Sequence, residues 1–244
     1  MSLEVVFSSF IAALDAAAVG VFATTGALVA SRKQMDIFGF ALLGTVTGVG
    51  GGTVRDVLLG RLPVFWVEKP AYVAIALVVS AVVFFTAHIP ESRYRLLLWL
   101  DAVGLSLVCV IGAGIGLDAG KGAFIAIVMG VITAVFGGII RDVLGGESPV
   151  ILRREIYVIP ALIGAMLFVA ATGAGVDYPT AAAAGFASCF TVRGLALFYG
   201  WSLPGYRPRP GRETREVAPE PAGGESPGAP SDEATARAKG GAET

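Results

Sequence analysis

An arginine–aspartate pair that follows two glycines occurs twice in this chain, each time within apolar sequence. Residues 51–58 read GGTVRDVL, and residues 137–144, which lie 86 positions later, read GGIIRDVL. The same spacing aligns residues 14–65 with residues 100–151 without a gap, and 18 of these 52 positions are identical. Charged side chains and glycines within apolar spans are costly in a membrane and commonly mark a functional path. The pattern predicts a duplicated membrane unit with one special segment in each copy.

The glycines of the two segments predict helices that are kinked or interrupted in the middle of the membrane. Each glycine costs about 1 kcal/mol relative to alanine within a helix and leaves the backbone uncovered. Freed carbonyls at that depth could replace the water around a cation. The candidate residues are Gly50, Gly51, Gly52, Gly137 and Gly138, with the hydroxyls of Thr47 and Thr133. Two alternatives remain open: the glycines allow tight helix crossing, and each Thr hydroxyl bonds to its own i−4 carbonyl.

Six charged residues are expected to form a constriction or gate beside these glycines. They are Arg55, Asp56, Arg141, Asp142, Asp15 and Asp101. Because neighbouring residues point to different parts of a helix surface, we expect pairing across the repeats. Arg55 would then pair with Asp101 or Asp142, and Arg141 with Asp15 or Asp56. The alternative is a purely structural cluster of salt bridges that holds the two halves together.

The elements that must position these residues are apolar spans. The chain is 55% hydrophobic and 15% charged, with a mean hydropathy of +0.75, outside the usual range of soluble proteins. Seven stretches are long enough to span a membrane once their flanking turns are counted. They are residues 5–30, 37–54, 70–90, 96–117, 122–140, 156–176 and 178–201. The last contains Arg193, which could extend to the membrane surface.

The predicted fold is an all-α membrane protein of two inverted three-helix repeats and one extra helix. Three spans per copy is an odd number, so the second copy must enter the bilayer with the opposite orientation. We expect a membrane domain at 1–204, with repeat one at about 5–90, repeat two at about 91–176 and the seventh helix at about 178–201. Residues 205–244 are rich in proline and charge, which predicts a disordered cytoplasmic tail.

Basic residues set the expected orientation. Arg32, Lys33, Arg93 and Arg95 lie in loops on one side, the side that also carries the C-terminal segment. Since cytoplasmic loops are rich in Lys and Arg, we expect the N-terminus outside and the C-terminus in the cytoplasm. The location would be a bacterial or archaeal-type plasma (inner) membrane, with membrane lipids as partners. Catalytic sets, metal clusters and nucleotide or nucleic-acid motifs are not found in the sequence, so we expect no enzyme, cofactor, metal or nucleic-acid partner.

The duplicated G-G-x-x-R-D-V-L segment resembles the prokaryotic members of the trimeric intracellular cation (TRIC) channel family, whose repeated unit is also labelled a glycine transporter domain. The resemblance covers about residues 5–200. It implies a homotrimer in which each protomer encloses a pore permeable to K⁺ between spans two and five. The glycines would line this pore, and the Arg–Asp pairs would lie near its constriction. One departure from symmetry is Phe136, which stands where the first copy has Gly50.

A secondary transporter of glycine or another small solute is the alternative function. Paired half-helix ends of opposite dipole would suit a small zwitterion, and the Arg–Asp cluster supplies both charges. A non-conducting membrane scaffold ranks third. Ohmic current, saturable uptake or neither would distinguish the three functions.

Overall fold

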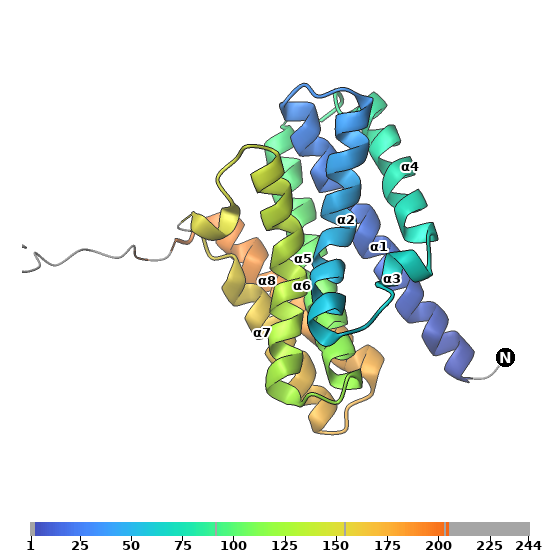
Figure 1. The fold of residues 1–244 in the computed structure, drawn as a ribbon. Coiled ribbons are helices and arrows are strands. Elements are labelled where there is room, and N and C mark those ends of the chain that lie inside the picture. The colour runs from blue at the N-terminus through green and yellow to red at the C-terminus, as the bar shows by residue number, and fades with distance from the viewer. Residues whose placement is uncertain (1–2, 91, 154, 203, 205–244) are drawn as a thin grey trace, which may run out of the picture. The chain divides into compact units, whose positions relative to one another are not determined.

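The computed structural model of the protein describes residues 3–90, 92–153, 155–202 and 204, with side chains from residue 12 onward. The regular secondary structure of the described residues is helical, apart from one antiparallel bridge between Glu155 and Ser202. The helices, shown in Figure 1, are α1 (Leu3–Arg32), α2 (Ile37–Leu59), α3 (Phe65–Glu68), α4 (Ala71–Thr86), α5 (Arg93–Asp118), α6 (Ala123–Leu144), the short 3₁₀ helix η1 (Val150–Leu152), α7 (Val158–Gly173) and α8 (Tyr178–Tyr199). The predicted tail at 205–244 lies outside the described residues.

Polar caps define where several helices begin. Asp36 accepts a hydrogen bond from the Gly39 amide at the start of α2, and Ser92 does the same for Arg95 at the start of α5. Asp177 accepts from the Thr180 amide at the start of α8, and this bond holds the pKa of the Asp177 carboxyl below its ordinary value. Such caps satisfy amides that have no partner within the helix.

Two equivalent three-helix units carry the duplicated sequence. In the first unit α1, α2 and α4 contact one another, and in the second α5, α6 and α7 make the same set of contacts. The units meet mainly through α2 against α6 and α1 against α5, while α8 packs on α5 and α7. In Figure 1 the α1–α2 connection and the α5–α6 connection lie at opposite ends of the bundle. The second unit therefore runs in the opposite direction to the first, as three spans per copy require.

Five described helices are long and apolar enough to cross a membrane, and two shorter apolar helices accompany them. The five are Ala12–Arg32, Ile37–Leu59, Arg93–Asp118, Gly122–Leu144 and Tyr178–Tyr199. The shorter ones, Ala71–Thr86 and Val158–Gly173, have 16 residues each. A straight helix of that length covers about 24 Å, less than the ~30 Å hydrocarbon core. Each occupies the third position of its unit, so the shortening is itself duplicated.

Spans two and five are not interrupted at their glycines, so the predicted interruption is not found. Helix α2 is continuous from Ile37 to Leu59, and α6 is continuous from Ala123 to Leu144. Backbone groups in apolar surroundings have no water to bond with, so they retain their helical hydrogen bonds. The intrinsic cost of the glycines is offset instead by the close packing that they permit between helices.

Candidate functional site

The two glycine segments meet each other where α2 crosses α6. A Cβ atom at Gly51 would overlap the carbonyl oxygen of Thr133, and a Cβ at Gly137 would lie 3.0 Å from the carbonyl oxygen of Thr47. Gly51 and Gly137 are equivalent in the two copies, and so are Thr47 and Thr133. The contact is therefore reciprocal about a pseudo-two-fold axis. It requires glycine because any larger residue would force the two helices apart.

The threonines of this crossing bond to their own helices. Thr47 donates its hydroxyl to the Leu43 carbonyl at 2.5 Å, and Thr133 donates to the Met129 carbonyl at 2.6 Å. Both hydroxyls thus follow the i−4 alternative and not the coordination of an opened backbone. A third glycine of each repeat, Gly26 in the first, faces the threonine of its own unit, since a Cβ there would lie 2.6 Å from the Thr47 hydroxyl oxygen.

The remaining predicted glycines contact side chains. A Cβ at Gly50 would lie 2.9 Å from Cδ1 of Ile140, and one at Gly52 would lie 2.6 Å from the Phe65 ring. A Cβ at Gly138 would lie 2.7 Å from the Tyr157 hydroxyl. A side chain at any of these three positions would therefore require the neighbouring side chain to move.

The Arg–Asp pair forms the same local structure in both copies. In the first, Arg55 Nε donates to Asp56 Oδ1 at 2.9 Å, while Asp56 Oδ2 accepts from the Phe65 amide at 2.9 Å. Phe65 begins α3, so the carboxylate caps that helix and holds the turn after α2. The turn itself begins at Gly60, whose positive φ of 67° suits glycine.

The second copy repeats this arrangement with one residue fewer in the turn. Arg141 Nε donates to Asp142 Oδ1 at 2.9 Å, and Asp142 Oδ2 accepts from the Val150 amide at 3.0 Å. Val150 begins η1, the counterpart of α3. Each aspartate therefore has a structural role as the cap of the short helix that follows its glycine–arginine–aspartate segment.

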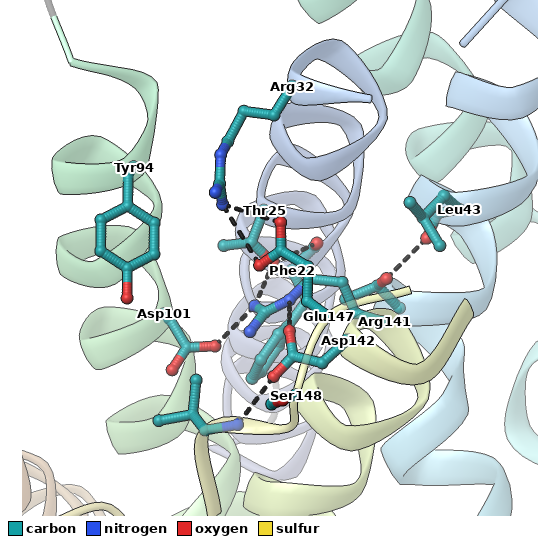
Figure 2. Close-up of polar contacts among 12 residues, drawn as sticks. Phe22, Thr25, Arg32, Leu43, Tyr94, Asp101, Arg141, Asp142, Glu147 and Ser148 are labelled. Carbon is teal, nitrogen blue, oxygen red and sulfur yellow. Dashed lines mark hydrogen bonds and ion pairs between the residues drawn. The ribbon is translucent and has the colours of Figure 1, made fainter. Parts of the chain in front are cut away.

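Beyond this shared core, the second copy makes a closed and fully buried ion-pair cluster, shown in Figure 2. Arg141 Nη1 lies 2.8 Å from Asp101 Oδ1 on α5 and 3.2 Å from the Thr25 hydroxyl on α1. Arg141 is completely buried, and the side chain of Asp101 is 1% exposed. The guanidinium therefore faces two carboxylates, Asp101 and Asp142, in surroundings where charge must be paired.

Three polar atoms of this cluster have no hydrogen-bond partner among the described residues. They are Asp101 Oδ2, Arg141 Nη2 and the Tyr157 hydroxyl, all completely buried. All three belong to residues that line the space at Gly138, where an added Cβ would lie 3.7 Å from Asp101 and 3.6 Å from Arg141. Buried polar atoms grouped in this way suit a single bridging water.

The first copy leaves the equivalent acid unpaired. Asp15, the counterpart of Asp101, makes no hydrogen bond or salt bridge with any residue of the described part of the chain. It lines a cavity of about 130 Å³ together with Arg55 and Asp56. Arg55 itself is 4% exposed and lies over the Phe65 ring, 5.6 Å from its centroid. In the second repeat Asp101 therefore pairs with the motif arginine, and we call this repeat closed. In the first repeat a cavity separates Asp15 from a direct ion pair with Arg55, and we call this repeat open.

The predicted pairing across the repeats is wrong. The ion pairs of the motif join Arg55 to Asp56 and Arg141 to both Asp101 and Asp142, all within one repeat. Helices α2 and α6 run in opposite directions from the glycine crossing, and each arginine lies four residues past its central glycine. At 1.5 Å per residue the two arginines lie about 6 Å to either side of the crossing, so each reaches only the acids of its own repeat.

Arg193 is buried and does not extend outward as the sequence suggested. It is 1% exposed, its Nη2 lies 3.1 Å from Glu155 Oε2, and its guanidinium lies 5.1 Å from the centroid of the Tyr157 ring. Sequence reasoning missed the contributions of Glu155, Tyr157 and Thr25. A repeat signal existed for one of them: Tyr157 follows Val150 by seven residues, as Tyr72 follows Phe65.

The site as a whole has more acid than base. Each repeat contributes two carboxylates and one guanidinium of the motif, so these six residues alone carry more negative than positive charge. In the cavity of the first repeat this surplus is offset, because Arg61 and Lys69 line it together with Glu68. No group of three His, Cys, Asp or Glu that could hold a metal ion occurs among the described residues.

Comparisons with known proteins agree with this architecture. Residues 12–88 and 98–173 match the family model described as Glycine transporter. The UPF0126 inner membrane protein YadS of Escherichia coli K12 is 41% identical over 193 residues, covering 78% of this chain and 93% of YadS. A UPF0126 membrane protein of Vibrio cholerae is 38% identical over 201 residues, covering 81% of this chain and 83% of that protein.

A solved structure shows higher sequence identity to this chain than these two relatives do. The TRIC trimeric intracellular cation channel orthologue from Rhodobacter sphaeroides is 61% identical, with a TM-score of 0.78, over 79% of this chain and all of that one. The solved relatives are described as channels and not as enzymes. The chain is a multi-pass membrane protein, and it belongs to the prokaryotic TRIC channel family, whose duplicated unit is described as a glycine transporter domain.

Proposed function

We propose that the protein is a membrane channel for monovalent cations, with K⁺ as the permeant ion. The observation that carries this proposal is the 61% identity and TM-score of 0.78 to a TRIC cation channel orthologue whose whole length is matched. The surplus of carboxylates around the glycine crossing supports a cation over an anion.

The conducting path would run within each protomer of a homotrimer, between α2 and α6. Closure would come from the contact of Gly51 with Thr133 and of Gly137 with Thr47, where the two backbones touch. Conduction then requires that α2 and α6 separate at this crossing. Gly50, Gly52 and Gly138 would widen the path once the helices part, and Phe136, which is 36% exposed, would lie near it on α6.

The charged residues would act on either side of this closure. Asp101, Arg141 and Asp142 would hold the path shut in the second repeat, whereas Asp15, Arg55 and Asp56 would form an open entrance in the first. The seven apolar helices would all span an inner membrane, with α4 and α7 crossing where the protein or the lipid is thin. The N-terminus would lie outside and the C-terminus in the cytoplasm, as the basic loops indicate.

Recording current from purified protein in planar bilayers with asymmetric KCl tests this function. We expect discrete current steps that reverse near the K⁺ equilibrium potential and that vanish when choline replaces K⁺. Bilayers without protein are the control. Absence of unitary current in a correctly assembled protein would contradict the channel.

A small-solute transporter is the second candidate, because the matching family model is described as Glycine transporter. Uptake of radiolabelled glycine into matched liposomes distinguishes the two functions. Saturable uptake without unitary current would favour the transporter, since a transporter closes its path at every cycle while a channel conducts through an open one.

A further inference from the structure

An ion pair joins the two units at the end of the bundle that holds the α1–α2 connection. Arg32 Nη1 at the end of α1 lies 3.1 Å from Oε1 of Glu147, which follows α6, and Figure 2 shows this pair beside the buried Arg141 cluster. Arg153 lies 3.7 Å from the other carboxylate oxygen of Glu147, and its Nη1 donates to the Tyr94 hydroxyl at 2.7 Å. One anion is therefore held between two cations, and it ties the end of α6 to the end of α1.

The other copy carries the same three charged positions with every sign reversed. The positions are Arg32, Glu147 and Arg153 around this ion pair, and in the same order Asp118, Arg61 and Glu68 in the other copy. The first two correspond at the spacing of 86 residues. The third corresponds at 85, because the turn after α6 is one residue shorter. Reversal of all three signs keeps the attraction, so the opposite end of the bundle holds the residues of an equivalent cluster, with one cation between two anions.

This second cluster is not formed in the described conformation. Arg61, Glu68 and Asp118 are all exposed, and none of them makes a salt bridge with any residue in the described part of the chain. Arg61 and Glu68 line the cavity of the open repeat together with Ile115 of α5. Asp118 lies three residues beyond Ile115 and so shares its face of the helix. The unpaired cation and its two anions thus surround one open space of about 130 Å³.

A second contrast between the repeats has the same direction. Deeper in the bundle, Asp101 pairs with Arg141 in the closed repeat, whereas Asp15 does not pair with Arg55 in the open repeat. Pairs at two different depths are therefore made in one repeat and missing from the other. In proteins built from inverted repeats, such an asymmetry is typical of one conformation, and a second conformation exchanges the roles of the two repeats.

We propose that the protein has a second conformation in which Arg61 pairs with Asp118 and Glu68, and the cavity of the first repeat closes. Arg32 and Glu147 separate in that conformation. The inference rests on the proposed path between the repeats, which is then sealed at one end in the described conformation and at the opposite end in the second. A channel built in this way has two distinct closed states.

Distances between two spin labels, measured by pulsed electron paramagnetic resonance on the full-length protein in lipid nanodiscs, test the proposal. The labels are attached through Val67→Cys and Phe124→Cys, two exposed positions close in sequence to Glu68 and Asp118. The native cysteines are buried, and the unchanged protein treated with the label is the background control. Co-expression with an excess of unlabelled chain leaves one labelled chain in each assembly. We expect two distance populations, of which the shorter belongs to the second conformation.

Charge variants should shift these populations in opposite directions, because each removes a contact that is made in one conformation alone. Glu147→Gln should raise the shorter population by about two- to fivefold, the effect of one exposed ion pair. Asp118→Asn should lower it by a similar factor, and the exchanged pair Arg61→Asp with Asp118→Arg should restore it. Lys33→Gln and Lys121→Gln each remove an exposed charge, one at each end of the bundle. They are the matched controls and should leave the populations unchanged.

A single distance population that Glu147→Gln does not alter would overturn the proposal, as would a shorter population that Asp118→Asn does not lower. If Glu147→Gln does not give a monodisperse protein, Arg32→Gln replaces it, since it removes the other partner of the same ion pair. The measurement needs no current. A protein that conducts K⁺ but has one conformation would therefore refute this proposal alone, and one that has both conformations without conducting would refute only the channel.

Discussion

Replacing Asp101 with alanine should destabilise the protein, whereas the same change at its counterpart Asp15 should not. Asp101→Ala removes one of the two carboxylates that neutralise the completely buried guanidinium of Arg141. Breaking a buried ion pair costs about 3–5 kcal/mol. The lower figure applies here because Asp142 still pairs with Arg141. Asp15→Ala removes no hydrogen bond or salt bridge that the described structure contains.

Thermal unfolding of the two purified variants measures this difference. For a chain of this size 1 kcal/mol corresponds to roughly 2–4 °C, so Asp101→Ala should lower the unfolding temperature by about 6–12 °C. Asp15→Ala should remain within about 2 °C of the unchanged protein. Equal losses in the two variants would mean that both repeats are closed in the membrane protein as purified. An unchanged unfolding temperature in Asp101→Ala would refute the structural role of its ion pair.

Substitutions also test three further contacts. Gly51→Ala should lower the unfolding temperature, because its Cβ would overlap the facing backbone of α6. Gly173→Ala is the control and should be neutral or stabilising, because there is open space around its Cβ. Equal effects of the two changes on the unfolding temperature would contradict a tight crossing of α2 and α6. Thr25→Val deletes a hydroxyl that accepts from the buried guanidinium and should cost about 1–2 kcal/mol in chemical unfolding, with no change counting against the bond. Glu155→Gln should destabilise the protein only when Arg193 is present, because the two side chains form an ion pair. A double-mutant cycle with Arg193→Met measures the coupling free energy between them. A coupling free energy of zero would contradict the pairing.

The duplication and its inversion could be predicted from the sequence, because they follow from the spacing of the repeated motif and from the number of spans in each copy. Gly51 and Gly137 fall at equal distances along two apolar runs, and three spans per copy allow only opposite orientations. The structure contains two equivalent units, and it adds the reciprocal glycine contact, which the sequence did not predict. The turn glycines could be predicted for a similar reason, since the positive φ of Gly60 is a local property that the surrounding fold does not decide.

The partners of the charged residues could not be predicted in this way. Sequence shows that Arg55 and Arg141 need counterions, but not that an aspartate one position later can bend back to its arginine while capping the next helix. It also places Asp15 and Asp101 at identical positions, which suggests identical roles. Asp101 pairs with its arginine and Asp15 does not, and this difference depends on how α1 and α5 pack against the rest of the bundle. Thr25 on α1 accepts a hydrogen bond from Arg141, whereas its counterpart Ile111 on α5 has no hydroxyl to offer Arg55.

The reciprocal contact between Gly51 and Thr133 and between Gly137 and Thr47 has a consequence for how such a chain could arise. A contact in which each side supplies the same two residues is isologous, the kind that joins the two subunits of a symmetric dimer. A single three-helix unit therefore contains the surface needed to dimerise with a copy of itself inserted in the opposite direction. Fusion of two such genes would fix one unit in each orientation and release both from the requirement of identity. After that event Asp15 could lose the partner that Asp101 keeps, and one ancestral half-site could become two sites with different tasks.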